Sequence, residues 1–201
     1  MKLALILLCG AAASLLAHAP EAAAQKTAAA AVPPPVVKHG GKIEMKYDGF
    51  NLETVVALRK MQVTCGSGRG FKDISKDVCV SLAVWLHCPG QQLDFVRRAR
   101  VQIIFESEEW DRRHTPAERG LVVVADGETL RLGSMSLVSN GVGSGLFVDK
   151  SKEVLEISIP YDAFAKIARA ESVEVRVGSD AFPLRDKNVA ALRDLNSRVK
   201  P

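Results

Sequence analysis

Residues 78–88 read VCVSLAVWLHC, and an apolar side chain occupies every second position of this stretch. Side chains of a β-strand alternate between its two faces, so this period of two predicts a long strand with one buried face. Trp85 and His87 fall together on the opposite face. They can meet a ligand only if the C-terminal part of the chain leaves that face open.

The same alternation recurs in three later segments, residues 101–105, 155–159 and 173–177. Residues 121–125 are continuously apolar, which is typical of a central strand. Asp126 and Gly127 then have the turn chemistry of a two-residue hairpin that leads into residues 130–132. We therefore expect residues 121–132 to form a β-hairpin.

Two helices are predicted among the strands. Pro160 can open a short helix whose apolar stripe is Phe164, Ile167 and Ala168. A second helix is expected over residues 186–199, with Asp186 as its N-cap and an apolar stripe of Val189, Leu192 and Leu195. We expect the first helix to plug an end of the fold and the second to pack over a sheet edge.

The spacing of turns indicates the fold class. About eight strands with turns every 8–12 residues are typical of an antiparallel β-sandwich of immunoglobulin-like type, which fits better than a closed barrel. In residues 52–63 the apolar positions change phase near Lys60, which predicts a β-bulge. The expected fold is mainly β, with one short helix and a C-terminal helix.

The first 42 residues have a different character. Lys2, an apolar run and then small residues predict a secretory signal peptide over residues 1–24, with Gln25 as the mature start. The alternative is a lipoprotein acylated at Cys9. Residues 25–42 are rich in alanine and proline and are expected to be a linker without fixed structure, followed by a β-sandwich domain over residues 43–201. No other stretch has the length of a membrane span, so we expect a periplasmic or secreted protein without a transmembrane segment after cleavage.

The composition excludes several classes. The chain has 201 residues, of which 47% are hydrophobic and 25% charged, so fibrous, collagen-like and low-complexity proteins are ruled out. The formal net charge is +4, but basic and acidic residues interleave between Arg97 and Arg119. Interleaved signs are typical of a solvated face, so we expect no nucleic-acid binding.

Three segments carry a resemblance to a known family. KYDGFNLETVV, VVVADGETLRLG and ISIPYDAFAKIARAESVEVRVGSDAFPL resemble a family of uncharacterised exported bacterial β-sandwich proteins, over most of residues 46–196. The resemblance implies a β-sandwich and export in a bacterium, and it transfers no activity and no site residues. In it, Gly127 and Gly178 stand at turns and Ala170 ends a helix.

Removal of the signal peptide leaves Cys65, Cys79 and Cys88, an odd number for an oxidising compartment. Cys65 and Cys79 flank a glycine-rich loop, and a hairpin register would bring them together. Cys79 and Cys88 share one strand and would lie about 30 Å apart. We predict a Cys65–Cys79 disulfide and a buried free thiol at Cys88.

Catalytic and metal-binding motifs are missing from the sequence. It contains no GxSxG, HExxH, CxxC or GxxxxGK[ST] pattern. His87 and Cys88 are neighbours on a strand, so their side chains point to opposite faces and cannot share a metal ion. We expect no catalytic residues, no metal and no cofactor.

The candidate binding patch is a loop containing Trp110, Arg112, Arg113 and His114, after a strand that ends near Ser107. Tryptophan beside arginines can bind a sugar, a peptide or a protein partner. In the alternative arrangement, Trp110 folds back over the end of the sandwich while the arginines pair with Glu106, Glu108 and Glu109.

Two functions remain compatible with the sequence. The first is an exported non-catalytic protein that binds a protein or a component of the cell envelope. The alternative is a periplasmic enzyme with a thiol nucleophile, Cys88 or Cys65, assisted by His87 or His114. A structural role with Cys88 in an intermolecular bridge is a third, and the sequence does not specify the oligomeric state.

Overall fold

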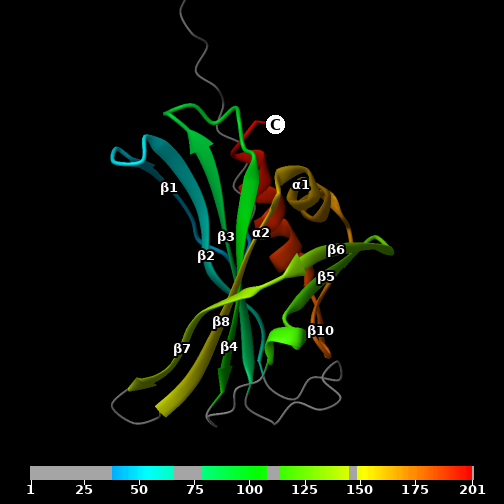
Figure 1. The fold of residues 1–201 in the computed structure, drawn as a ribbon. Coiled ribbons are helices and arrows are strands. Elements are labelled where there is room, and N and C mark those ends of the chain that lie inside the picture. Colours follow the sequence, from blue (N-terminus) through cyan, green and yellow to red (C-terminus); the bar gives the residue numbers. More distant parts are fainter. Residues whose placement is uncertain (1–37, 66–77, 108–113, 145–148, 201) are drawn as a thin grey trace, which may run out of the picture. The chain divides into compact units, whose positions relative to one another are not determined.

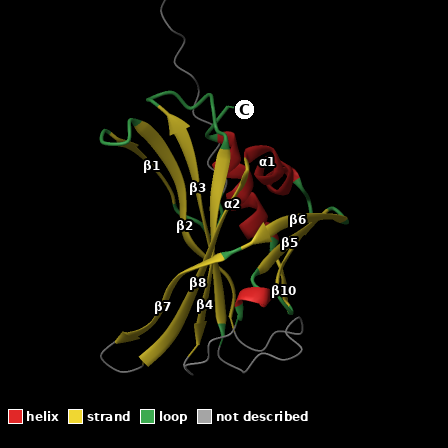
Figure 2. Cartoon of the chain, viewed as in Figure 1, coloured by secondary structure: helices red, strands yellow, loops and turns green. Residues whose placement is uncertain are grey.

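Strand β3 (Cys79–Pro89) is an interior strand of a six-stranded antiparallel sheet, as its alternating sequence predicts. The structure is a computed structural model that describes residues 38–65, 78–107, 114–144 and 149–200. These residues form two antiparallel sheets, two α-helices and a short 3-10 helix, whose arrangement is drawn in Figures 1 and 2. The predicted signal peptide, with Cys9, lies outside the described residues.

The six-stranded sheet has the order β1-β2-β3-β4-β8-β7. Its other strands are β1 (Ile43–Asp48), β2 (Glu53–Cys65), β4 (Arg98–Ser107), β7 (Ser136–Ser144) and β8 (Asp149–Pro160). The two antiparallel sheets confirm the predicted mainly β fold, which is consistent with a β-sandwich. The first four strands follow one another as a meander, which differs from the Greek-key connections of immunoglobulin domains. The register of β2 on β3 shifts between Leu58 and Met61, which confirms the bulge predicted near Lys60.

The second sheet has four antiparallel strands in the order β10-β9-β5-β6. Its strands are β5 (Gly120–Ala125), β6 (Glu128–Ser134), β9 (Val173–Val177) and β10 (Asp180–Pro183). The hairpin of β5 and β6 is confirmed: Asp126 and Gly127 both have positive φ, 48° and 82°, as a type I′ turn requires.

Both helices lie on the same side of the six-stranded sheet as the smaller sheet. Helix α1 (Tyr161–Arg169) follows Pro160 directly and ends at Ala170, while helix α2 (Asp186–Ser197) contacts α1 and β2. A short 3-10 helix (Pro116–Glu118) precedes β5. The N-cap of α2 is Arg185, so the prediction of Asp186 as the cap was wrong by one residue; Asp186 occupies the first turn.

The position predicted for α2 was also wrong. Instead of covering a sheet edge, α2 fills the space between the layers, because Val189, Leu192 and Leu195 are buried in the single hydrophobic core. That core joins the inner faces of both sheets with the apolar stripes of both helices. The cavity between the layers measures about 30 Å³, which is too small for an organic ligand.

Residues 38–42, which the sequence places in the linker, contact the folded unit. His39 Nε2 lies 2.8 Å from Asp194 Oδ2 in α2, and both side chains are more than nine-tenths buried. Gly41 is so close to β2 that a Cβ there would stand 2.4 Å from the Leu58 side chain. The folded unit therefore extends upstream of Ile43.

Candidate functional site

The helices and the second sheet leave the outer face of the six-stranded sheet open over β1, β2 and the end of β3, whereas Ala83, Ile104 and Val154 on the same face are buried. All three of these elements pack against the opposite face, where the buried side chains of β3 point. Trp85 and His87 lie on the open face and are partly exposed. The C-terminal part of the chain does not cover them, so a ligand can reach them.

A groove runs over β2 on this face. Small side chains, Val55 and Ala57, form its floor, because the register places them between taller side chains of β1 and β3. Ala57 stands between Glu44 and Trp85, and Val55 between Lys46 and His87. The groove measures about 710 Å³ and is lined by these residues and by Met45, Asp48, Asn51, Glu53, Arg59 and Arg100.

The wall formed by β3 is ordered by two contacts. The guanidinium of Arg100 on β4 lies over the Trp85 ring, 4.8 Å from its centroid. His87 Nδ1 lies 2.9 Å from Glu53 Oε1, so the imidazole and the carboxylate hold each other at the end of the groove. An aromatic ring, a guanidinium, an imidazole and a carboxylate are therefore presented side by side in orientations set by neighbouring strands.

The wall formed by β1 alternates in charge, with Glu44, Lys46 and Asp48 on the groove side. Glu44 is paired with Arg59, Nε to Oε2 at 2.6 Å, and Asp48 accepts the backbone N–H of Phe50 in the hairpin turn. Donors and acceptors therefore face the groove from both walls, which suits a ligand rich in groups that both donate and accept.

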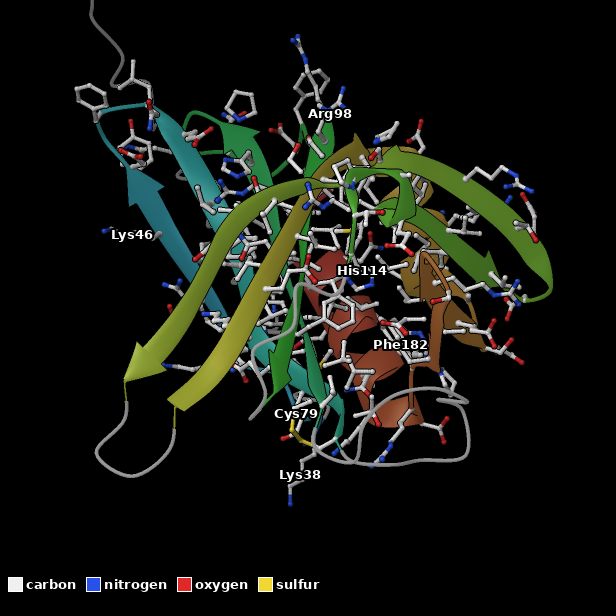
Figure 3. All side chains as sticks on the ribbon, turned by 60° about the horizontal axis from the view of Figure 1, so that its bottom comes forward. Lys38, Lys46, Cys79, Arg98, His114 and Phe182 are labelled. Atoms are coloured by element: carbon white, nitrogen blue, oxygen red, sulfur yellow. A yellow bond between two sulfur atoms is a disulfide. The ribbon has the colours of Figure 1, made fainter. Side chains whose placement is uncertain are left out.

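A second polar cluster is buried between the two sheets. His114 Nδ1 lies 2.7 Å from Glu153 Oε2 on β8, and its Nε2 lies 3.3 Å from Asp180 Oδ2 on β10. The ring also packs against Phe105 of β4, and the Arg119 side chain donates to the His114 carbonyl oxygen at 3.2 Å. Figure 3 shows His114 in the interior near Phe182.

The pKa of His114 is raised to about 9. Burial alone would lower it, but hydrogen bonds to Asp180 and Glu153 and the negative charges of both carboxylates outweigh that effect. At neutral pH the ring is therefore an imidazolium that donates to a carboxylate on each sheet. This cluster links the sheets and has no open access: His114 is only 3% exposed.

Of the binding patch predicted from the sequence, the structure describes only His114. His114 is buried, so its side chain cannot contribute to a surface patch. Trp110, Arg112 and Arg113 lie outside the described residues. Glu106, a predicted partner of the arginines, accepts a hydrogen bond from Lys60 at 2.6 Å.

The predicted disulfide is present. Cys65 and Cys79 are bonded and stand directly opposite each other on β2 and β3. Cys88 is a free cysteine and 0% exposed, as predicted. Burial raises its thiol pKa, as do the negative charges of Asp94 and Glu53, and a high pKa with no access disfavours a thiolate nucleophile.

Among the described residues, no group of three or more His, Cys, Asp or Glu side chains is placed to hold a metal ion. In the same part of the chain, no helix combines the length and apolarity needed to cross a membrane.

Comparisons with known proteins identify no relative: no family model, no curated protein and no solved structure matches the chain. The resemblance to exported bacterial proteins therefore stays a prediction, and function must be argued from the groove.

Proposed function

We propose that the protein is an exported, non-catalytic binding protein that holds a glycan strand of the cell envelope in the groove over β2. The observation that carries the proposal is the open sheet face on which Trp85, Arg100 and the His87–Glu53 pair surround a small-residue floor. The groove is open to solvent, unlike the interior, where the cavity between the layers is too small for an organic ligand.

The chemistry of the groove supports a sugar polymer. A pyranose ring has apolar C–H faces that stack on an indole and hydroxyl groups that donate and accept along its rim. Trp85 offers the indole, while Arg100 and His87 donate and Glu53 accepts. The mixed charges of the two walls disfavour a strongly acidic or strongly basic polymer, because either would meet like charges.

Export rests on separate support. The predicted signal peptide over residues 1–24 points to secretion, and the Cys65–Cys79 disulfide is of a kind that persists in oxidising compartments. Because the sequence resembles exported bacterial proteins, peptidoglycan is the first envelope glycan to test.

The test is cosedimentation of the folded domain with purified peptidoglycan. Trp85→Ala and His87→Ala should each weaken binding by about tenfold or more, since aromatic anchors dominate binding energy. Phe95→Ala is the matched control: Phe95 is 51% exposed and also stacks under an arginine, Arg97 at 5.1 Å, but it lies outside the groove. Equal binding by all three variants would overturn the proposal.

Fluorescence provides an independent readout. The chain has two tryptophans, Trp85 and Trp110, so Trp110→Phe leaves Trp85 as the sole reporter. Soluble glycan fragments should shift the emission of this variant, and saturating fragments should protect Trp85 from an aqueous quencher. An unchanged spectrum at saturating fragment concentration would contradict a site at Trp85.

A further inference from the structure

Strand β1 forms one edge of the six-stranded sheet, and no strand in the described part of the chain pairs with its outer side. The backbone N–H of Arg59 donates to the carbonyl oxygen of Lys42 at 2.9 Å, so Lys42 belongs to a hydrogen-bonded pair with β2. Because such pairs alternate along antiparallel strands, the N–H and C=O groups of Ile43, Met45 and Tyr47 point away from β2. Figure 3 shows Lys46 at this margin of the sheet.

The other edge strands are short or have an interrupted backbone, and β1 is not interrupted in this way. Strand β10 has four residues and ends at Pro183; β6 contains Gly133, and β7 contains Gly141 and Gly143. Both β6 and β7 also shift register against their neighbours. Strand β1 has six residues without proline, glycine or a shift, which is the kind of edge that templates another strand.

The charges along β1 are self-complementary. On the groove face, Lys42, Glu44, Lys46 and Asp48 follow one another with alternating sign. If a second copy of β1 lies antiparallel with Met45 opposite Met45, Glu44 faces Lys46 and Lys42 faces Asp48, and each contact occurs twice. Opposite charges directly across a strand pair stabilise it.

The same register satisfies the backbone. With Met45 opposite Met45, the two methionines form two backbone N–H···O bonds with each other. Ile43 of each copy forms two more with Tyr47 of the other copy. These are the residues whose polar groups point outward from β1. Met45 is 64% exposed and Tyr47 39% exposed, so the pairing would also cover apolar surface.

The neighbouring registers place like charges opposite each other. Displacement by two residues in one direction places Lys46 opposite Lys46 and Glu44 opposite Asp48. Displacement in the other direction places Glu44 opposite Glu44 and Lys42 opposite Lys46. Like charges in these positions are destabilising, so the charge pattern selects one register.

We propose that β1 is a self-association edge, through which two copies of this chain pair antiparallel about a twofold axis at Met45 and join their sheets into one of twelve strands. The inference is independent of the ligand proposed for the groove, because it rests on the edge of β1 and on its charge order. The two grooves would then lie on the same face of the joined sheet, on either side of the axis.

A pair of charge reversals tests this dimer by sedimentation velocity at low ionic strength. With Glu44→Lys alone, the introduced lysine faces Lys46 of the second copy, and with Lys46→Glu alone, the introduced glutamate faces Glu44. Each variant should therefore weaken self-association by about tenfold or more. In an equal mixture, every charged position of one variant faces an opposite charge on the other. The mixture should form a heterodimer although neither variant dimerises alone.

The mixture guards against a folding artefact, because a misfolded variant would not be rescued by its partner. Arg131→Glu, which reverses an exposed charge on the edge strand β6 of the other sheet, is the matched control and should dimerise like the wild type. A monomeric wild type would overturn the proposal and point to another segment of the chain on this edge. Dimers that persist in both single variants would overturn it in favour of another interface.

Discussion

The buried imidazolium of His114 should make the stability of the domain depend on pH in a defined window. Its pKa in the folded state is about 9, against about 6.5 in an unfolded chain. Because the folded pKa is the higher one, the stabilisation is fully present below pH 6.5 and is lost as the pH rises towards 9. Within that window the folded state binds one more proton than the unfolded state, so the free energy of unfolding falls by about 1.4 kcal/mol per pH unit.

The expected loss follows from the width of the window. From pH 6.5 to 9 the free energy of unfolding should fall by about 3 kcal/mol, which for a domain of this size lowers the Tm by roughly 6–12 °C. Glu153 and Asp180 contact the ring from different sheets, while the Arg119 guanidinium donates to the His114 carbonyl oxygen, so the effect reports the whole cluster. Urea denaturation at pH 6, 7, 8 and 9 measures it directly.

The variant His114→Gln isolates this contribution from other titrating groups. It should be less stable than the wild type at pH 6 by about 3 kcal/mol, and the gap should close towards pH 9. Gly127→Ala is the control, since it removes no titratable group and should lower the stability by the same amount at every pH. Parallel pH profiles for the wild type and His114→Gln would refute the argument.

Two further predictions concern the disulfide and one glycine. Reduction of Cys65–Cys79, which closes a loop between residues 14 apart, should lower the free energy of unfolding by about 3 kcal/mol, and without reductant the folded protein should resist thiol alkylation until denaturant exposes Cys88. Gly178→Ala should destabilise by about 2 kcal/mol or more in chemical denaturation, because its φ is +57° and a Cβ would stand 2.7 Å from the Glu118 carbonyl oxygen. Gly127→Ala, with positive φ but no atom within 4 Å of the added Cβ, should cost about half as much, and equal losses would contradict the steric argument.

Local patterns in the sequence predicted the local structure. The alternation in residues 78–88 led to β3, the Asp126–Gly127 turn to its hairpin, and the phase change near Lys60 to the bulge. Each of these depends on neighbours within a few positions. The disulfide belongs to the same class, since a hairpin register was sufficient to bring Cys65 and Cys79 together.

The same local patterns did not predict how segments far apart in the sequence pack together. The apolar stripe of α2 showed that one face is buried but not which surface covers it, and so a sheet edge was predicted where the interior was found. The groove depends on Val55 and Ala57 standing between β1 and β3, which requires the register of three strands.

One feature of the sequence did indicate the buried cluster around His114. Glu153 falls in phase with the inward residues Leu155, Ile157 and Ile159, and a carboxylate in that phase needs a buried cation as its partner. His114 was instead interpreted as part of a surface loop, because nothing local to residues 110–114 indicates burial.

The position of α2 governs the order in which the fold can form. Asn188 of α2 donates to the carbonyl oxygen of Gln62 at 3.1 Å, a contact that joins residues 126 positions apart. The β2–β3 hairpin needs only nearby chain, whereas its inner face stays uncovered until residues 186–197 have joined it. If the chain is exported as we propose and crosses a membrane from its N-terminus, it would complete its core only after α2 had emerged on the far side.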